Sequence, residues 1–587
     1  MCGIVGYTGK RQAAPLLLAG LKKLEYRGYD SAGIAVETKS GIAIEKREGR
    51  VSKLQCEGLT GGVGIGHTRW ATHGAPSERN AHPHRYGKIV VVHNGIIEND
   101  LALKQECLAR GEIFSSDTDS ETIAHMIAHR GGDLLTAVKE TCRRLSGSYA
   151  LAVLSEDEKG TIVCARMKSP LIVGLGEDGA CAASDMPAIA EKGRTLYALE
   201  DGEFAVLTAS SVQIYDNNLH PIRRDPLEYD SSAEDSRLGD YHHYMRKEMA
   251  EIPAVLAKNL PNFANEPSFS EFYKVLCHTE YIQIVACGTA YHSGLCAKHA
   301  IEKLCRVPVE VSVASEYRYC DPIVPKNTLC LAVSQSGETA DTLAAAEIAK
   351  ERGAKLVAVT NVSYSSLTRL ADFVLPTNAG QETAVAATKS FNAQLLLLYG
   401  IARALAESKG RTAPSLEGLA PLAEKTLEGS EDVRSWTPYF VEVKSVFFLG
   451  RGADYCTALE GSLKLKEISY IPSEGYSAGE LKHGTLALVD EKTPVVAIIT
   501  DPNLAEKTMN AVHEVSSRGA KVFLVTSLPE YCKRKEVFAS VVVPPFAEAF
   551  SPILSVIPLQ ALAYYTALAR GNDPDKPRNL AKSVTVE

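Results

Sequence analysis

The sequence predicts an α+β domain of packed antiparallel sheets flanked by helices, followed by two tandem α/β domains. Up to about residue 225, short apolar strands alternate with Gly-rich turns, as in antiparallel sheets. Beyond residue 242, apolar strands alternate instead with helices of about 10 to 15 residues, the pattern of parallel β/α units. Inside this second part, residues 328–362 resemble residues 493–527. One long-period repeat indicates a duplicated domain rather than a solenoid.

The length of 587 residues exceeds what one hydrophobic core normally organises, which favours several domains. The elements expected in the first part are strands at 33–36, 89–93, 148–154 and 171–174, and helices at 13–24 and 118–130. A polar stretch at 225–240 indicates a linker. The expected limits are a first domain at 1–225, a linker at 226–242, α/β domains at 243–420 and 421–570, and a C-terminal tail at 571–587.

The composition is that of an ordinary globular protein, with 45% hydrophobic and 23% charged residues and a net charge of -8. Nucleic acid is not an expected partner, because phosphate-backbone binding needs concentrated Lys and Arg. No apolar stretch approaches the ~20 residues that span a bilayer, so we expect no membrane contact and a cytoplasmic location. The 14 cysteines form no CxxC pair and are expected to be free, buried thiols. We expect neither a metal nor a cofactor.

Cys2 directly follows Met1, so removal of Met1 leaves a thiol and a free α-amine on one residue. An α-amine titrates near ~8 and a thiol near ~8.5, so each assists the other close to neutral pH. The dipeptide alone would be read as a chance N-terminal cysteine. Three further segments follow in order, at 27–33, 67–74 and 93–99. With them, the first part resembles the N-terminal-nucleophile glutamine amidotransferase domain.

That resemblance implies the roles of the first site. Cys2 attacks the glutamine side-chain amide with its own amine as base, and Asn94 and Gly95 hold the oxyanion. The other residues that it implies are Arg69 for the substrate carboxylate, Asp119 for its ammonium, Thr72 and His73 for the pocket wall, and Trp70 as the gate of an ammonia passage. Two alternatives stay open: Asp119 as a helix-starting residue and Trp70 as a core residue.

In the first repeat, a strand at 329–333 runs into Ser334, Gln335, Ser336 and Thr339, and then into a helix at 340–352. Hydroxyls and free N–H groups at a helix start form an anion site that suits a sugar phosphate. The structural alternative is a capped helix with no ligand. The second repeat carries Thr500-Asp501-Pro502 at the matching turn, adding an acid and keeping one hydroxyl. Only the first copy is therefore expected to bind phosphate.

The second copy has its own chemistry in Glu460, Lys464 and Glu467, which spacings of four and three place near one helix face. A solvated, salt-bridged face is the alternative. His483 follows in a Gly-rich loop, and Lys582 lies in the tail. Together with the segments 287–289, 334–339, 464–470 and 479–484, these residues resemble the sugar-isomerase (SIS) half of the glutamine:fructose-6-phosphate aminotransferase family. The similarity covers essentially the whole chain.

This second resemblance implies a synthesis of D-glucosamine 6-phosphate and L-glutamate from L-glutamine and fructose 6-phosphate, the first step of hexosamine formation. The residues that it implies for the phosphate are Thr289, Ser334, Gln335, Ser336 and Thr339, with a backbone contact to the sugar from Val385. Ala290 stands where the family often has Ser.

For the chemistry at the sugar, the family pattern implies that Lys582 forms an imine with the C2 ketone. Glu467, assisted by Lys464, moves the proton between C1 and C2, and His483 opens the ring. In the family that histidine comes from the other subunit, so a homodimer with a shared active site is expected.

Two other functions remain as alternatives. One is a different glutamine-dependent amidotransferase, such as one acting on phosphoribosyl pyrophosphate, which would need a pyrophosphate loop preceded by paired acids. The other is a sugar-phosphate-sensing regulator, which would not need Cys2, Glu467, His483 and Lys582 together.

Overall fold

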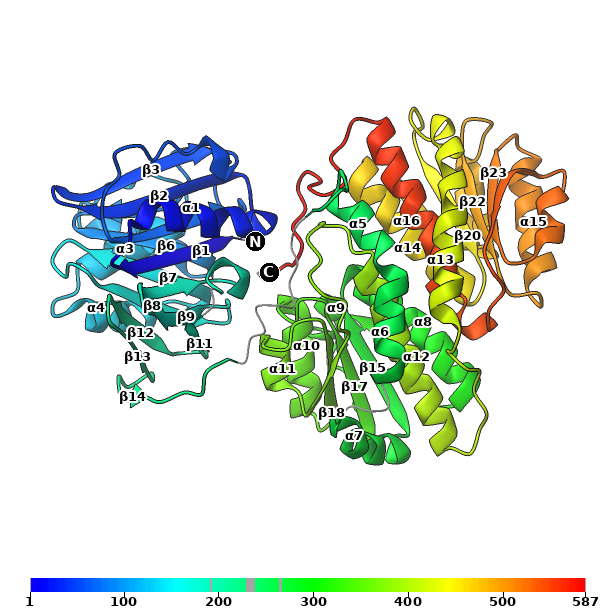
Figure 1. Ribbon diagram of the computed structural model, residues 1–587, viewed down its shortest axis with the longest axis horizontal. Helices are drawn as coiled ribbons and strands as arrows, with labels where there is room; N and C mark the ends of the chain where they lie inside the picture. Colours follow the sequence, from blue (N-terminus) through cyan, green and yellow to red (C-terminus); the bar gives the residue numbers. More distant parts are fainter. Residues whose placement is uncertain (1, 191–192, 228–237, 263–266, 586–587) are drawn as a thin grey trace. The chain divides into compact units, whose positions relative to one another are not determined.

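The computed structural model describes residues 2–190, 193–227, 238–262 and 267–585 (Figure 1). The chain forms two compact units, one of Met1–Glu234 with Ser583–Glu587 and one of Asp235–Lys582. Most of the expected linker at 226–242 lies outside the described residues.

The first unit contains two seven-stranded antiparallel sheets. The first has the order β11-β9-β10-β1-β4-β2-β3, with bounds β1 Gly3–Gly9, β2 Ser31–Thr38, β3 Gly41–Glu48, β4 Val63–Arg69, β9 Ile172–Gly176, β10 Gly179–Ala183 and β11 Thr195–Ala198. The second has the order β14-β13-β12-β8-β7-β6-β5, with bounds β5 His84–Tyr86, β6 Ile89–Ile97, β7 Gly147–Ser155, β8 Ile162–Met167, β12 Phe204–Thr208, β13 Ser211–Tyr215 and β14 Pro221–Ile222. The predicted antiparallel architecture is confirmed.

Strand β6 shows how sequence periodicity builds this unit. Val90 and Val92 enter the core between the two sheets, whereas Ile89 and Val91 enter a second core under the helices. Alternate residues of a strand point to opposite faces, so a strand buried on both faces reads as a continuous apolar run. Helices α2 (Asp100–Ala109), α3 (Ser120–Ala128) and α4 (Leu134–Cys142) cover that second core, and α1 (Ala13–Lys23) covers the other sheet. The packing of β6 on both faces therefore fixes the backbone position of its last residues, which include Asn94 and Gly95.

The second unit contains two five-stranded parallel sheets with the same strand order. The first is β16-β15-β17-β18-β19, with bounds β15 Tyr281–Ala286, β16 Val309–Val313, β17 Thr328–Val333, β18 Lys355–Thr360 and β19 Phe373–Pro376. The second is β21-β20-β22-β23-β24, with bounds β20 Val446–Gly450, β21 Ser473–Ser477, β22 Val495–Ile499, β23 Val522–Thr526 and β24 Val537–Val542. The identical order confirms the predicted pair of tandem α/β domains.

Helices cover both faces of these sheets. On the first sheet, α9 (Ala314–Tyr317), α10 (Ala340–Glu351) and α11 (Ser366–Leu370) lie on one face, and α6 (Ile252–Asn262), α8 (Gly288–Cys305) and α12 (Lys389–Ser408) on the other (Figure 1). The remaining helices of this unit include α5 (Tyr244–Ala250), α7 (Pro267–His278), α13 (Leu419–Gly429), α14 (Ala453–Ser469), α15 (Ala505–Ser516) and α16 (Pro552–Ala569). One continuous apolar core joins α8 and α12 to α14 and α16. The two α/β domains therefore share a core and pack as one body.

Helix α16 departs from the expectation that no apolar stretch approaches membrane-spanning length. Its 18 residues have a mean hydropathy of 1.4, and by length and composition alone they would cross a bilayer. However, 83% of that window is buried inside the fold, where the helix packs against α14 and the 3-10 helix η4 (Ser430–Tyr439). A core helix that is apolar all round gives the same sequence signal.

Candidate active sites

Cys2 lies at the start of β1, a strand inside its sheet, and its thiol meets the end of β4. The Trp70 N–H points to Sγ at 3.3 Å, and the Asn94 side-chain amide donates to the Cys2 carbonyl at 3.0 Å. Burial raises the pKa of the Cys2 thiol, although the Trp70 N–H and the Arg69 guanidinium act in the opposite direction. A thiol whose pKa is raised needs a base before it becomes a nucleophile.

Asn94 and Gly95 lie in the last part of β6, beside Cys2. The Asn94 Oδ1 atom is buried and has no hydrogen-bond partner among the described residues. Gly95 has φ +137, and a Cβ there would lie 2.0 Å from the Ser148 carbonyl oxygen, so no larger residue fits. The structure thus places Asn94 in contact with Cys2, and Gly95 follows it in β6.

Arg69 ends β4 and is nearly fully buried. Its guanidinium donates to the carbonyl of His73, to that of Gly74 at 2.9 Å and to that of Ala75 at 3.4 Å. These bonds hold the loop that follows Trp70. Thr72 on this loop is exposed and His73 is half-buried.

Asp119 and Trp70 bear on the two alternatives left open by the sequence. Asp119 directly precedes α3 but makes no cap bond to it. Its buried carboxylate accepts instead from the Ile97 N–H at 2.9 Å and the Ser120 hydroxyl at 3.2 Å, which ties it to the end of β6. Trp70 is half-buried and contacts Tyr29 edge to face. Asp119 thus begins α3 without capping it through its side chain, and Trp70 is half-buried rather than enclosed in a core. The glutamine-binding role of Asp119 and the gating role of Trp70 stay predictions.

Four buried histidines behind this site were not anticipated from the sequence. The His67 and His82 rings stack at 4.0 Å, and the His82 and His84 rings meet at 4.5 Å. His93 Nδ1 lies 2.8 Å from the Ser120 hydroxyl. Burial lowers the pKa of all four imidazoles, so they are neutral at pH 7. No spacing in the sequence marks them, because they come from three separate strands and a loop.

A pocket of about 160 Å³ in the second unit brings together every expected sugar-site residue except His483. It lies at the carboxyl end of β17, where ligands of open α/β sheets commonly bind. The expected residues that line it are Thr289, Ser334, Gln335, Ser336, Thr339, Val385, Lys464, Glu467 and Lys582. The starts of α8, α10 and α12 all contribute to the lining, so their dipoles add to the two lysines in favouring an anion.

The turn after β17 is held in shape by its own hydroxyls. Ser334 Oγ lies 3.0 Å from Thr339 Oγ1 and accepts from the Gly337 N–H at 3.1 Å, and Ser336 Oγ accepts from the Glu338 N–H at 3.2 Å. Gly337 has φ +64, and a Cβ there would lie 2.1 Å from the Ser365 hydroxyl. The turn is thus a compact arrangement of hydroxyls at the start of α10.

The matching turn of the second copy is already occupied by a side chain of the protein. Thr500 donates from its N–H to the Asp454 carboxylate at 2.8 Å and from its hydroxyl at 2.5 Å. Burial raises the pKa of Asp454 to about 6. Gly452 (φ +59) corresponds to Gly288 (φ +55), so Asp454 stands where the first copy has Ala290. An internal carboxylate in this place leaves no room for an anionic ligand.

Lys464 and its neighbours form a buried charge cluster. Lys464 Nζ lies 2.6 Å from Glu467 and 3.5 Å from Glu460, and it donates to Thr289 Oγ1 at 2.9 Å. Burial lowers the pKa of Lys464, but the two glutamates outweigh this and raise it. Glu460 also contacts His292 at 2.8 Å. With Lys464 only 1% exposed, the alternative of a solvated salt-bridged face is wrong.

Lys582 is docked into the pocket and faces an acid that the sequence did not indicate. Its Nζ lies 2.5 Å from Glu382 Oε2, with side-chain exposures of 5% and 0%. Burial raises the pKa of Glu382, but Lys582, the Ser390 hydroxyl and the Thr388 N–H outweigh it and hold the pKa well below its usual range. An ammonium paired with a carboxylate is not nucleophilic, so a proton must leave this pair before Lys582 becomes a nucleophile.

His483 is the one expected residue that a single chain does not bring to the pocket. It ends the short 3-10 helix η5 (Glu480–His483), is exposed and does not line the cavity.

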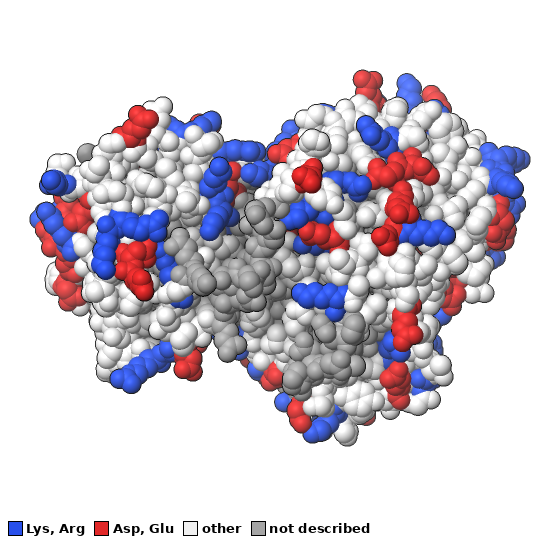
Figure 2. All heavy atoms as spheres, viewed as in Figure 1, with Lys and Arg blue, Asp and Glu red and all other residues white. Residues whose placement is uncertain are grey.

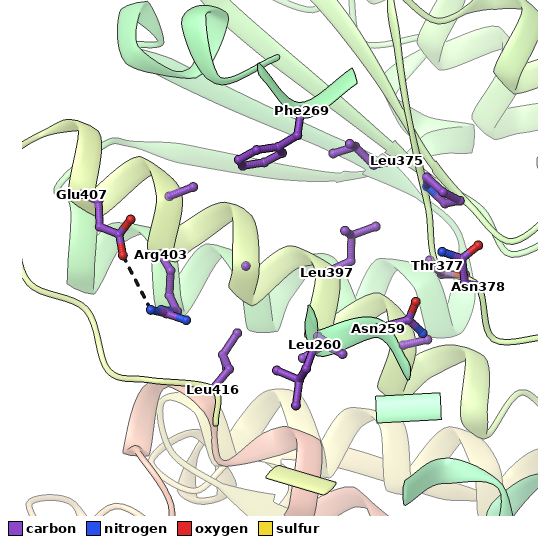
Figure 3. A pocket seen from close by; sticks show the side chains of 15 residues that line it. Asn259, Leu260, Phe269, Leu375, Thr377, Asn378, Leu397, Arg403, Glu407 and Leu416 are labelled. Carbon is purple, nitrogen blue, oxygen red and sulfur yellow. Dashed lines mark ion pairs between the residues drawn. The ribbon is translucent and has the colours of Figure 1, made fainter. Parts of the chain in front are cut away.

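Two other features stand apart from these sites. A pocket of about 210 Å³ between α6, α7, β19 and α12 is lined mainly by apolar residues, with Arg403 3.6 Å from Glu407 at one side (Figure 3). It contains none of the expected catalytic residues.

Within the described residues, one cluster of metal-ligand type occurs, at Cys107, Glu112 and His125. The Arg110 guanidinium already donates to Cys107 at 3.1 Å and to Glu112 at 2.6 Å, so the positive charge beside these two groups is that of the arginine.

One face of the molecule shows how its charged side chains are distributed. On the face drawn in Figure 2, the described Lys and Arg side chains are interspersed with Asp and Glu rather than gathered into one basic patch. All fourteen cysteines are free, and most are buried.

Fold and sites together define a glutamine amidotransferase domain joined to a pair of sugar-isomerase domains. Family models match accordingly: a glutamine amidotransferase domain at residues 67–191, and a SIS domain at 276–404 and again at 439–570. The chain is 47% identical to a glutamine--fructose-6-phosphate aminotransferase [isomerizing] of Clostridium tetani and 45% identical to that of Methanosarcina acetivorans, with 100% of both chains covered in each comparison. The chain belongs to the family of isomerizing glutamine–fructose-6-phosphate aminotransferases.

A solved structure agrees with the second unit. The C-terminal domain of a glucosamine-fructose-6-phosphate aminotransferase from Francisella tularensis matches with a TM-score of 0.54 and 35% identity, covering 58% of this chain and 100% of that one.

Proposed function

We propose that the protein hydrolyses L-glutamine and transfers the ammonia to fructose 6-phosphate, giving D-glucosamine 6-phosphate and L-glutamate. The observation that carries the proposal is the 160 Å³ pocket, in which a buried, acid-paired Lys582 faces a hydroxyl-lined turn at the start of a helix. A phosphate at Ser334 to Thr339 anchors the substrate. The carbonyl carbon then lies within the pocket that also holds Lys582 and Glu467.

In the first unit, the α-amine of Cys2 removes the thiol proton, and Sγ attacks the glutamine side-chain carbonyl. Asn94 and Gly95 stabilise the oxyanion, a contribution of about 3 kcal/mol for each donor in comparable sites. Arg69 and Asp119 orient the substrate carboxylate and ammonium, with Thr72 and His73 at the pocket wall. Ammonia has to reach the second unit before water protonates it, and Trp70, next to Arg69, is the proposed gate.

In the second unit, Lys582 bonds to C2 of the open-chain sugar and the ketone oxygen leaves as water. Ammonia then replaces Lys582 at C2, which releases the lysine. Glu467 removes a proton from C1 and returns it to C2, and Lys464, 2.6 Å away, stabilises the Glu467 carboxylate before the first transfer and after the second. This sequence converts a ketose into an aminated aldose without a cofactor.

A homodimer completes the site in this proposal. His483 is exposed and lies off the pocket of its own chain, which suits delivery to the pocket of a second copy. There it would open the sugar ring as an acid and base. We also propose a cytoplasmic location and keep the domain limits 1–225, 243–420 and 421–570. Neither alternative function needs the combination of Cys2, Glu467 and Lys582.

The direct test supplies glutamine labelled with ¹⁵N at the side-chain amide together with fructose 6-phosphate. Mass spectrometry should detect glucosamine 6-phosphate carrying the label. Omitting either substrate should abolish the product. Release of labelled ammonia without any aminated sugar would overturn the proposal.

Substitution in the two copies tests the phosphate site. Ser336→Ala should weaken binding of fructose 6-phosphate about tenfold, since a hydrogen bond to a charged group contributes about 1.5–3 kcal/mol. Pro502→Ala is the matched control, because it changes the corresponding position of the copy whose turn is filled by Asp454. Calorimetry should show unchanged affinity for that control. Equal losses in both variants would contradict the assignment of phosphate to the first copy.

A further inference from the structure

Helix α5 contacts the loop that carries the counter-ion of Lys582. Glu248 Oε1 accepts hydrogen bonds from the N–H groups of Thr383 at 2.5 Å and Ala384 at 3.2 Å. These two peptide groups lie between Glu382, which pairs with Lys582, and Val385, which lines the pocket. A shift of Glu248 would therefore move both ends of this loop.

The same helix also holds the C-terminal tail. The Asp575 carboxylate accepts from the N–H groups of Tyr244 and Met245, each at 2.8 Å. The Asp575 carbonyl accepts in turn from the Val385 N–H at 3.0 Å. Loop, tail and helix α5 thus form one closed set of hydrogen bonds around the lysine end of the pocket.

Glu248 is only 2% exposed, and its second oxygen, Oε2, is buried without a hydrogen-bond partner among the described residues. Burial raises its pKa to about 8, assisted by the Glu382 carboxylate and opposed by Lys582. Glu248 also interacts electrostatically with Tyr244, on the same helix. Near neutral pH, Glu248 therefore carries a proton, and Lys582 faces one ionised acid rather than two.

We propose that Glu248 is a positioning residue for the imine-forming lysine, fastening the 382–385 loop to helix α5 so that the Glu382 carboxylate stays against Lys582. This inference rests on the proposed role of Lys582. During imine formation the Lys582 ammonium gives a proton to Glu382, nitrogen bonds to C2, and that proton leaves with the ketone oxygen as water. One ammonium and one ketone give one iminium and one water, so Glu382 needs to be fixed at both stages.

The test measures the rate at which borohydride traps fructose 6-phosphate covalently on Lys582 in the full-length protein. Glu248→Ala should slow trapping at least tenfold, while affinity for the sugar phosphate changes less than threefold, because the turn at 334–339 does not contact Glu248. Glu248→Gln keeps an acceptor oxygen and resembles the protonated acid, so its trapping rate at pH 7 should stay within threefold of the unmodified protein. Glu431→Gln is the control, since it removes the negative charge from a different α5 contact, the ion pair with Arg246 at 2.5 Å.

A pH series provides a readout that a purely structural role would not move. In the unmodified protein the trapping rate should change as Glu248 ionises near pH 8, and Glu248→Gln should lack that change. The pKa of Glu248 is higher in the folded state than in the unfolded state, so the free energy of unfolding falls as pH rises toward 8. The side-chain amide in Glu248→Gln does not ionise, so the melting temperature of this variant should rise relative to that of the unmodified protein as pH increases toward 8.

The outcomes separate the two proposals. No labelling of Lys582 in the unmodified protein would overturn the role of the lysine itself. Two outcomes would overturn the positioning role and leave the proposed function intact. One is normal labelling of Lys582 in both the unmodified protein and Glu248→Ala. The other is the same pH profile for the unmodified protein and Glu248→Gln. A loss of affinity as large as the loss of trapping would also overturn it.

Discussion

Cys2→Ala abolishes glutamine-dependent formation of glucosamine 6-phosphate, with an expected loss of at least about 10³-fold. The reason is that the Cys2 thiol is the proposed nucleophile beside Asn94, and an alanine side chain offers no nucleophile in its place. The sugar pocket belongs to the other unit, so binding of fructose 6-phosphate should be unchanged. Glutamate release and calorimetry with the sugar measure the two effects separately.

Blocking removal of Met1 serves as the chemical control for the same step. The α-amine would then remain an amide, and activity should fall as it does in Cys2→Ala. Full glutamine-dependent activity in either protein would show that Cys2 is not the nucleophile.

Borohydride added with fructose 6-phosphate attaches the sugar covalently to the C-terminal peptide at Lys582. This lysine is docked and 5% exposed, and a buried acid holds it at the pocket, so a reducible imine forms there rather than at a solvated lysine. Peptide mapping by mass spectrometry identifies the labelled site. Lys582→Arg should lose the label and at least about 10³-fold of its sugar turnover.

Two other lysines serve as internal controls in that experiment. Lys464 lines the same pocket, and Lys482 is largely exposed on η5 and pairs with Glu514 at 2.7 Å. Label on either residue, or normal sugar isomerisation by Lys582→Arg, would show that Lys582 is not the imine-forming residue.

The sequence was most informative where a motif carries its own geometry. Ser334 to Thr339 follow a strand and begin a helix, so their place at the carboxyl end of the sheet follows from the topology of parallel β/α units. The continuous apolar run at residues 89–92 likewise predicts a strand, and Asn94 and Gly95 lie near its end.

Residues that act through distant partners were not predictable in this way. Glu382 and Glu248 lie in an irregular loop and on a short helix, and only the folded tail shows that they surround Lys582. The buried histidines come from separate segments that converge only in the folded first unit. Asp454 could not be identified as the occupant of the second turn, because its contact with Thr500 spans 46 residues.

The filled turn around Asp454 has an evolutionary consequence. A domain whose turn is neutralised by its own carboxylate no longer depends on a ligand at that position, so selection could reshape its helix for another task. Lys464 and Glu467 lie on α14, the same helix that carries Asp454, yet they line the pocket of the first copy. The two copies therefore differ in what their turns hold. The first turn is lined by hydroxyls, whereas the second is filled by Asp454, and the helix that carries Asp454 extends Lys464 and Glu467 into the pocket of the first copy.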